Sequence, residues 1–475
     1  MREITPKALW ALLTVLLVAC SGAGPTSVAD GLTEAKTADG RYISWEEHLI
    51  DDQDAAEVRL RGAAALGTAD LDQDGIPDVV SAFQESSHVR VAFGSEGPDS
   101  WFRLSLAEGA EAIGVADLAI EDVNGDGYPD LIAASETHLL YFQNPGGRTH
   151  NQTVRGWRWD RVIPRVTKGR GAFRRVWFTD LDQDGRFEVL AVSALAPRSA
   201  GPALAQGESV LWWFEPPEDP LDPDGWREHV LSRVNGPLAA GLADLDGVGD
   251  IDVFAITGGE QPVRRFENLG GSPMAFRAHV GAVETPEGGE LSPGGCSLAF
   301  HDFNGDGRLD VVFSDTPASI AWLEQPADAG ERWKQHAVGS VAPDLVAGFA
   351  LLDITGDGQP DVIVGSASQG PSEDDGQNAA ATDPAGRIAW FENPGSVGGA
   401  WKRHDVSRRA RGLFGAFAFL DLDQDGDLDL LGTRGNSGFL DGVFWLEKLH
   451  SAAPAKSFTP SREKESRALP LPDQQ

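Results

Sequence analysis

The chain alternates between short apolar runs and polar turns, and the same order of runs returns seven times. Each unit opens with small and apolar residues, as in GAAALGTA, and an acidic turn separates this run from a β-branched one such as DVVSAF. An aromatic run such as VLWWFEP comes third, and a short fourth run often places Trp first and His fourth, as in WREHVL. Short runs rich in Val, Ile, Phe and Trp and bounded by Gly, Pro and Asn predict β-strands.

The repeat predicts the fold class. Four strands repeated seven times, at intervals of about 50–70 residues, predict an all-β chain that forms a seven-bladed β-propeller of four-stranded antiparallel blades. The last unit stops at VFWLEKL without a fourth run, whereas ISWEEHLI, residues 43–50, is a fourth run with no unit before it. We therefore expect this N-terminal strand to complete the last blade and close the ring, which removes an exposed sheet edge. The propeller is assigned to residues 41–449.

The first twenty residues have the pattern of an export signal. Arg2 and Lys7 precede an apolar run that ends in LVAC at Cys20, and this run is too short to span a membrane. LVAC resembles a bacterial lipobox, which implies a lipoprotein signal peptide over residues 1–20 and a lipid on Cys20. A plain secretory signal is the alternative. Because Ser21 and not aspartate follows the cysteine, the resemblance favours lipid anchoring at the outer membrane.

The segments that flank the repeats differ from them in composition. Residues 21–40 are small and polar, which predicts a flexible tether, and residues 450–475 show no strand pattern, which predicts a disordered tail. The other cysteine, Cys296, lies in an apolar run. With Cys20 lipidated no disulfide can form, so we expect Cys296 to be a small buried hydrophobe.

Charge narrows the class of partner. The formal net charge is −34, which argues against nucleic acid as a partner because phosphate binding needs the opposite sign. Such a charge indicates either a solvated acidic surface or bound cations. Much of it lies in the seven acidic turns, of which DLDQDGIPD at residues 70–78 is the first.

The acidic turns have a fixed spacing. Counted from the first Asp, acidic or other oxygen-bearing side chains stand mostly at positions 1, 3, 5 and 9, with glycine usually at position 6 to allow a sharp turn. Unpaired carboxylates this close would repel one another by several kcal/mol in a partly desolvated site. Calcium takes six to eight oxygens from flexible loops, so the spacing predicts a calcium ion held by these side chains and by the backbone carbonyl at position 7.

Seven ligand sets follow from this spacing. They are Asp70, Asp72, Asp74, Ile76 and Asp78 in the first loop; Asp122, Asn124, Asp126, Tyr128 and Asp130 in the second; Asp180, Asp182, Asp184, Arg186 and Glu188 in the third; Asp244, Asp246, Asp250 and Asp252 in the fourth; Asp302, Asn304, Asp306, Arg308 and Asp310 in the fifth; Asp353, Thr355, Asp357, Gln359 and Asp361 in the sixth; and Asp421, Asp423, Asp425, Asp427 and Asp429 in the seventh.

The loops differ in the number of acids they supply. Up to seven calcium ions are expected, and the fourth site is expected to be the weakest or empty, because Val248 stands at position 5 and only Asp250 at position 7 can compensate. The helical calcium hand also begins D-x-D-x-D-G, but it needs a Glu at position 12 and flanking helices. In this chain the last acid stands at position 9 and a strand-like run follows, so the helical hand is excluded.

The phrases DLDQDGIPDVV, DVNGDGYPDLI and DFNGDGRLDVV resemble the FG-GAP/VCBS repeats of the integrin α-subunit propeller and of many bacterial surface proteins. The Phe-Gly and Gly-Ala-Pro dipeptides that give the family its name are only partly kept, for example in GLFGAFAF, so the resemblance is greater to the bacterial variants. It implies calcium between the first and second strands of each blade and partner binding on the opposite face. We therefore expect a monomeric binding, adhesion or scaffold module at the bacterial envelope, with a protein or glycan ligand.

An envelope enzyme acting on polysaccharide or sugar, similar to lyase or dehydratase propellers, is the alternative. No catalytic triad, phosphate loop or nucleophile elbow is present in the sequence. His88 and His138 each precede a third strand on adjacent blades, and with Asp117 or Glu136 they could bind zinc or act as acid and base. Five other histidines recur at one position of the fourth strand, and we expect these to support the blades; they are His48, His229, His279, His336 and His404.

Overall fold

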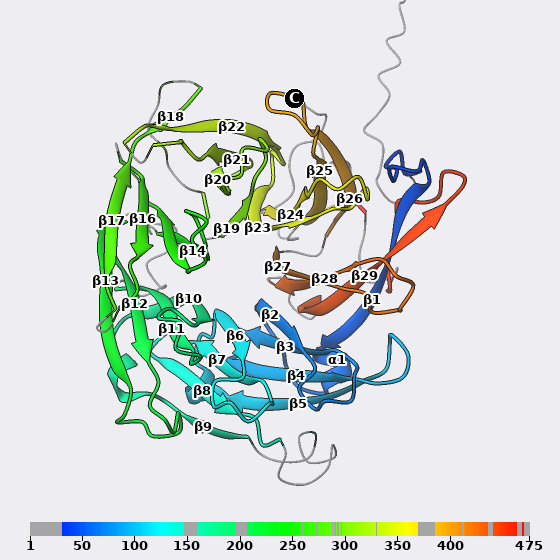
Figure 1. Ribbon diagram of the computed structural model, residues 1–475. Coiled ribbons are helices and arrows are strands. Elements are labelled where there is room, and N and C mark those ends of the chain that lie inside the picture. Colours follow the sequence, from blue (N-terminus) through cyan, green and yellow to red (C-terminus); the bar gives the residue numbers. More distant parts are fainter. Residues whose placement is uncertain are drawn as a thin grey trace, which may run out of the picture.

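The computed structural model describes residues 31–462, with gaps at 147–154, 156–158, 196–206, 237, 259–260, 272–273, 287, 289–290, 292–293, 296, 329, 369–384, 411–412 and 436–439, together with residues 468–469. The predicted signal peptide, Cys20, most of the tether and Cys296 lie outside the described residues. Within the described part the chain forms seven sheets arranged as blades around a central axis (Figure 1). The predicted seven-bladed β-propeller is confirmed.

In each blade the chain passes from the innermost strand outward, so neighbouring strands follow one another in sequence. The strands of the first four blades are β2 (Ala63–Ala69), β3 (Asp78–Phe83), β4 (His88–Gly94) and β5 (Trp101–Glu108); β6 (Asp117–Glu121), β7 (Asp130–Ala134), β8 (Leu139–Gln143) and β9 (Asp160–Val162); β10 (Ala172–Thr179), β11 (Glu188–Ala194), β12 (Glu208–Glu215) and β13 (Arg227–Asn235); and β14 (Ala239–Ala243), β15 (Asp252–Ile256), β16 (Val263–Asn268) and β17 (Phe276–Gly281).

The last three blades follow the same order and carry two extra short strands. Blade 5 contains β19 (Leu298–His301), β20 (Asp310–Thr316), β21 (Ser319–Glu324) and β22 (Trp333–Ser340), with β18 (Val283–Glu284) beside β22; blade 6 contains β23 (Leu345–Leu352), β24 (Asp361–Ser368), β25 (Ala385–Glu392) and β26 (Lys402–Arg409); blade 7 contains β27 (Leu413–Leu420), β28 (Asp429–Gly435), β29 (Gly442–Ser451) and β1 (Tyr42–Asp52), with β30 (Phe458–Thr459) beside β1.

The N-terminal strand closes the ring as predicted. β1 pairs antiparallel with β29, from Tyr42 opposite Ser451 to Asp52 opposite Gly442, and so becomes the outer strand of the last blade. Figure 1 shows this junction as the blue strand beside the red one. The closure leaves neither the first nor the last blade with a missing strand.

The core lies between neighbouring blades. The second strand β3 is buried along its whole length, because the adjoining blades cover both of its faces. The innermost strands are made of small residues because they converge at the axis. A side chain at Gly348 of β23 would place its Cβ 1.9 Å from the carbonyl oxygen of Gly415 in the next blade, which no other residue type can accommodate.

The segments flanking the ring differ from their predictions. β30 pairs in parallel with β1, and Phe458 in it is buried, so residues 450–475 are not wholly without structure. Leu469 is also buried, and its backbone N–H donates to the carbonyl of Arg408 in blade 6. The outer edges of blades 6 and 7 offer unpaired backbone groups, and these short pairings satisfy some of them. In the predicted tether, Leu32 bridges to Lys456.

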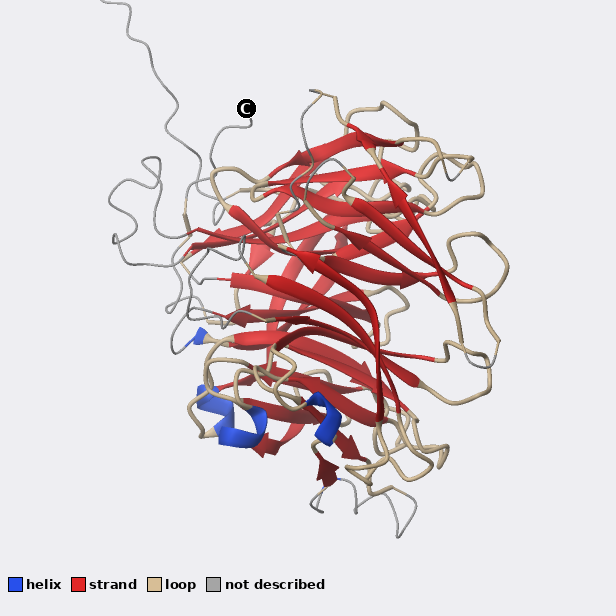
Figure 2. Ribbon diagram, turned by 90° about the vertical axis from the view of Figure 1, so that its left-hand side faces the viewer, coloured by secondary structure: helices blue, strands red, loops and turns tan. Residues whose placement is uncertain are grey.

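Helices are few and short. Those that lie wholly within the described part of the chain are α1 (Gln53–Ala56), η2 (Gly109–Ala112) and η3 (Arg165–Thr167), and each follows the outer strand of a blade. Seen from the side, the strands run across the ring from face to face and the helices gather near one face (Figure 2). Among the described residues, no helix combines the length and the apolar character that crossing a bilayer requires.

Candidate functional site

The seven acidic loops lie on one face of the ring. Each joins the first strand of a blade to the second, and the first strands all run toward the same face. In the first blade Asp70 follows the end of β2 directly, and Asp78 is the first residue of β3. The residue at position 9 begins the second strand in every blade, so the fold positions this acid at the root of each loop.

Two residues of each loop have left-handed backbone conformations. Positions 4 and 6 have positive φ in all seven loops, and they are Gln73 and Gly75, Gly125 and Gly127, Gln183 and Gly185, Gly247 and Gly249, Gly305 and Gly307, Gly356 and Gly358, and Gln424 and Gly426. Of these two positions, only position 6 was expected from the sequence to allow a sharp turn. A glutamine with positive φ is uncommon, so the three DLDQDG copies need a specific reason for it.

In two of the three copies the glutamine at position 4 links neighbouring loops. The Nε2 amide of Gln73 donates to the carbonyl oxygen of Gly127 in the second loop at 2.6 Å, and that of Gln183 donates to the carbonyl of Gly249 at 3.0 Å. Each bond joins position 4 of one loop to position 6 of the next. These hydrogen bonds offset the cost of a left-handed glutamine, and they connect acidic turns that lie more than fifty residues apart in sequence.

The carboxylates at positions 1 and 5 hold the loop backbone. Asp70 accepts hydrogen bonds from the backbone N–H groups of Asp74, at 3.1 Å, and Gly75, at 2.9 Å. Asp74 accepts from the backbone N–H of Ile76 at 2.9 Å. Closely similar bonds occur in the other loops, so these side chains curl the turn and keep their remaining lone pairs for another partner.

The acid at position 9 joins the loop to the blade. Asp78 is fully buried; it accepts from the backbone N–H of Leu71 at 2.8 Å and from that of Gly94, at the end of the third strand, at 2.9 Å. Equivalent pairs of bonds are made by Asp252, Asp310, Asp361 and Asp429.

Burial changes the titration of these acids. Desolvation raises the pKa to about 7, against the hydrogen bonds that lower it, in Asp78, Asp130, Glu188, Asp310, Asp361 and Asp429. These six carboxyl groups resist ionisation because no positive charge compensates their buried negative charge. A cation bound beside them would favour the ionised form and would itself be stabilised.

The structure brings positions 1, 3 and 9 together. Oxygens of these residues lie within 4.8 Å of one another in the first, third and seventh loops, namely in the groups Asp70, Asp72 and Asp78, Asp180, Asp182 and Glu188, and Asp421, Asp423 and Asp429. In the fourth loop the group is Asp244, Asp246 and Asp250. Position 5 belongs to none of these groups, and the second, fifth and sixth loops have an amide or a hydroxyl at position 3.

Several side-chain oxygens of the acidic loops are buried and have no hydrogen-bond partner among the described residues. They include Oδ1 of Asp72, Oγ1 of Thr355, Oδ1 of Asp421 and Oδ1 of Asp250. A buried polar atom without a partner costs about 1–3 kcal/mol, and more when it is charged. Orphaned oxygens at positions 1, 3 and 7, beside other carboxylates, fit a hard cation such as calcium. The acidic loops are therefore clusters that can hold a metal ion.

In the part of the chain that the structure describes, arginine side chains from outside the loop reach the acids of the first and fourth loops. In the fourth, Nη2 of Arg265 lies 2.6 Å from Asp246 and 2.8 Å from Asp252. Arg265 faces His279 across the outer two strands, the same register at which Trp322 faces His336 in blade 5. Arg265 on β16 therefore places a positive charge where other blades have an aromatic ring on the third strand. It does so in the blade whose loop lacks an acid at position 5.

The first loop receives its arginine from the next blade. Arg155 pairs with Asp72, and its Nη2 lies 2.6 Å from Asp74 and 3.0 Å from the carbonyl of Gly94. This guanidinium approaches the loop from the connection between β8 and β9. This contact could not be predicted from the sequence, because the two segments lie about eighty residues apart.

The recurring histidines lie within their own blades, as predicted. Four stack on a tryptophan of the third strand, with ring centroids 3.7–4.2 Å apart, and all five contact a glutamate of that strand. The stacked pairs are His48 with Trp445, His229 with Trp213, His336 with Trp322 and His404 with Trp390. His279 faces Arg265 instead.

The alternative site around His88 and His138 does not assemble as a three-ligand group among the described residues. Both ring nitrogens of His138 have partners: Nε2 lies 2.9 Å from the carbonyl oxygen of Glu111 and Nδ1 lies 2.8 Å from the hydroxyl of Thr137. Burial lowers the pKa of His138. Asp117 lies on the innermost strand β6, where it lines a central cavity of about 370 Å³ and accepts from the backbone N–H of Val176.

The comparisons with known proteins agree with the repeats and the ring. A family model described as FG-GAP-like repeat matches residues 122–191, 244–313 and 302–364. The chain is therefore a seven-bladed β-propeller that contains FG-GAP-like repeats, and this fold supports a binding or scaffold module in general. No curated protein sequence matches the chain.

Two solved structures are similar to the chain at low sequence identity. One is an Agrocybe aegerita lectin, described for the specific recognition of non-reducing terminal N-acetylglucosamine, with 15% identity, a TM-score of 0.42 and coverage of 85% of this chain and 89% of the lectin chain. The other is BBS1N in complex with ARL6DN, with 12% identity, a TM-score of 0.44 and coverage of 83% of this chain and 94% of that chain.

Proposed function

We propose that the protein is a calcium-stabilised binding module exported to the bacterial envelope. The observation that carries the calcium part is the convergence of carboxylate oxygens at positions 1, 3 and 9, with orphaned buried oxygens among them, in loops repeated around one face. The ion would supply positive charge at the root of each turn. The side chains of the loop provide the oxygens. Because the acid at position 9 also hydrogen-bonds the loop backbone and the end of the third strand, binding of the ion would stabilise the second and third strands as well.

The sites are expected to differ. The first, third and seventh loops have three converging acids, the second, fifth and sixth offer neutral oxygens at position 3, and the fourth already has Arg265 beside its acids. Affinity in the range of about 10⁻⁴–10⁻³ M is typical of extracellular calcium modules. Up to seven ions are proposed, with the fourth site the weakest.

Thermal unfolding tests the calcium proposal. A ligand that binds only the folded state stabilises it, so the melting temperature should rise with added calcium and fall when a chelator removes it. Asp421→Asn should reduce the number of ions counted by equilibrium dialysis by about one, whereas Asp99→Asn, which alters an exposed acid outside the loops, should not. An unchanged melting temperature with and without chelator would refute the proposal.

The envelope location rests on Cys20 and the segment before it. We place the protein as a lipid-anchored monomer, with the membrane contacted through the lipid alone. Metabolic labelling with a radioactive fatty acid should mark the wild-type protein and leave Cys20→Ala unmarked. Recovery of unlabelled wild-type protein as a freely soluble exported chain would favour the plain secretory signal.

The ligand side is assigned to the face opposite the acidic loops. The strand connections on that face carry η2, η3 and α1 and are free of the proposed calcium ligands. Loops on a rigid scaffold are the usual place for recognition, so a protein or glycan ligand is proposed there. Protection of this face, and not of the acidic face, from hydrogen exchange on ligand binding would support the assignment.

A further inference from the structure

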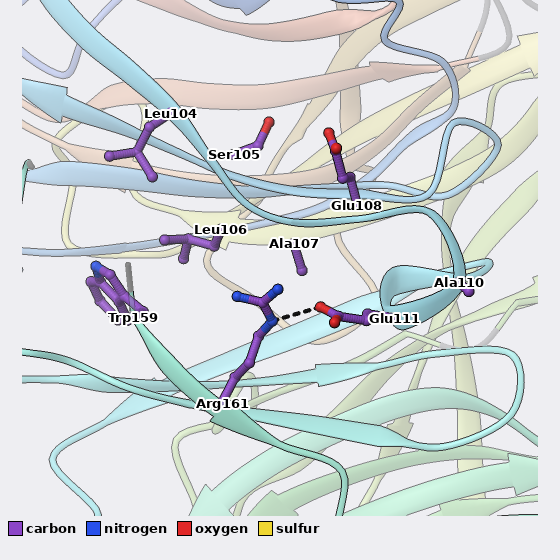
Figure 3. Close-up of a pocket in the computed structure, with 9 residues that line it drawn as sticks. All are labelled: Leu104, Ser105, Leu106, Ala107, Glu108, Ala110, Glu111, Trp159 and Arg161. Carbon is purple, nitrogen blue, oxygen red and sulfur yellow. Dashed lines mark hydrogen bonds and ion pairs between the residues drawn. The ribbon is translucent and has the colours of Figure 1, made fainter. Parts of the chain in front are cut away.

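A cavity of about 580 Å³ lies between the outer strands of the first two blades (Figure 3). Strand β5 supplies one wall through Leu104, Ser105, Leu106, Ala107 and Glu108, and Trp159 and Arg161 of the second blade supply the other. The η2 turn closes one end through Ala110 and Glu111. This volume lies within the range of about 300–1,000 Å³ that is usual for small-molecule sites.

The cavity exists because the outer strand of blade 2 is short. β9 has three residues, whereas β5 has eight and β13 has nine. A strand of ordinary length would cover the side of β5 that now lines the cavity. The apolar floor contains Leu106, Ala107 and the indole of Trp159, all of them buried.

The polar groups of the cavity are both donors and acceptors. Nε of Arg161 donates to Glu111 at 2.6 Å, which fixes the guanidinium plane. Figure 3 shows the two terminal nitrogens of Arg161 directed away from Glu111, toward the β5 side of the cavity, and they have no partner among the described residues. The Nε1 atom of Trp159 is buried and likewise without a partner. Glu108 adds an exposed carboxylate at the rim.

His88 and His138, the two histidines considered in the sequence analysis as an alternative site, lie beside the end of the cavity that carries Glu108 and Glu111. Nε2 of His138 donates to the backbone carbonyl of Glu111 at 2.9 Å and so holds the η2 turn that carries the partner of Arg161. Nε2 of His88 lies 3.7 Å from the carboxylate of Glu108. Both histidines therefore contact residues that line the cavity, and His138 acts as a positioning residue for its charged pair.

We propose that this cavity binds a neutral saccharide of one or two rings. Sugar hydroxyls both donate and accept, which matches a guanidinium fork beside two carboxylates, and the apolar face of a sugar ring matches the half-buried alkyl group of Leu104 on the β5 wall. The cavity holds two acids for one base, and the whole chain is strongly acidic, so a charged acidic ligand is disfavoured. The proposal rests on the proposed binding function and names its ligand class.

Ligand-detected NMR on the calcium-loaded full-length protein tests the site. The probes are glucose, galactose, mannose, their N-acetylated amino sugars and their β-linked dimers, with glucuronate as the charged member. At least one neutral sugar should bind, and Arg161→Ala should weaken that binding about tenfold or more, because a hydrogen bond to a charged group is lost. Ala110→Trp, at an exposed position on the rim, should block the cavity without affecting folding.

Arg277→Ala is the matched control. Arg277 is also an outer-strand arginine paired with a glutamate, at 2.9 Å from Glu267, but it lies in blade 4. Sugar binding that survives both cavity variants, binding of glucuronate alone, or no binding to any neutral sugar would overturn the proposal. The calcium-dependent melting shift, measured on the same sample, separates this outcome from a failure of the calcium proposal.

Discussion

At the scale of single residues, Arg265 supplies a positive charge where we propose a calcium ion in the other blades. In blade 4 the arginine stands where other blades have an aromatic ring, and it contacts the acids at positions 3 and 9 of the loop. The same loop has Val248, an exposed valine, at position 5. Loss of an acid and gain of a base occur together, so the negative charge of the loop is partly offset from within the chain.

Removal of this arginine should destabilise the protein with or without calcium. Arg265→Ala leaves the buried Asp252 without its partner, and breaking such a pair costs about 3–5 kcal/mol. Chemical denaturation in chelator measures this loss directly. Arg233→Ala is the control, since it breaks an exposed pair with Glu208 and should cost less than about 1 kcal/mol.

The double variant Val248→Asp/Arg265→Trp restores the pattern of the other loops. It should bind about one more calcium ion than the wild type, because the added acid takes position 5 and the guanidinium no longer occupies the loop. Equilibrium dialysis counts the ions. An unchanged count in a folded double variant would contradict the interpretation that Arg265 replaces the metal.

At the scale of elements, hydrogen bonds join several neighbouring loops of the acidic face to one another. Beside the two glutamine bonds, the side-chain amide of Asn144 donates to the carbonyl of Leu71 at 2.9 Å, and that of Gln325 donates to the carbonyl of Leu245 at 2.9 Å. Each of these amides follows a third strand and reaches the loop of the preceding blade. The acidic loops are therefore held by contacts across blades as well as within them.

The short strand β30 should contribute measurably to stability. Phe458 is buried against the seventh and sixth blades, and truncation of a buried phenylalanine costs about 3–5 kcal/mol. Phe458→Ala should therefore lower the free energy of unfolding by roughly this amount in denaturant titration. Thr459→Ala, at the exposed neighbouring position, serves as the control. An equal, small effect of both substitutions would mean that β30 does not stabilise the ring.

At the scale of the whole molecule, the sequence predicts the ring far better than it predicts the contacts of the loops. The number of blades and the closing strand follow from periodicity, because each blade repeats the same local pattern. Arg155 and Arg265 could not be predicted to reach the acids, because their positions depend on how neighbouring strands and blades pack. β30 was missed because a two-residue strand has no periodicity, and its burial depends on an edge formed by β1.

The acidic face should make stability depend on pH in opposite ways with and without calcium. Six of the seven position-9 acids have folded-state pKa values of about 7, above the ordinary values of 3.8 for Asp and 4.5 for Glu. Their contribution to stability is present in full below about pH 4 and is lost as the pH rises through about 7. In chelator the melting temperature should therefore fall between pH 5 and pH 8, whereas the gain on adding calcium should grow.

Melting curves across this pH range, in chelator and in calcium, measure both trends. Repetition in high salt provides the control, because salt screens repulsion among exposed charges but acts much less on buried groups. A melting temperature in chelator that rises from pH 5 to pH 8 would contradict the assignment of raised pKa values to these acids.

The pairing of β1 with β29 has a consequence for biosynthesis. About 390 residues separate Asp52 from its partner Gly442, and a ribosome adds about 5–20 residues per second. The first strand to emerge must then wait roughly 20–80 s for the strand that receives it. During that interval one end of the nascent chain presents a bare strand edge, so premature association with another polypeptide is the hazard that cellular holdases must prevent.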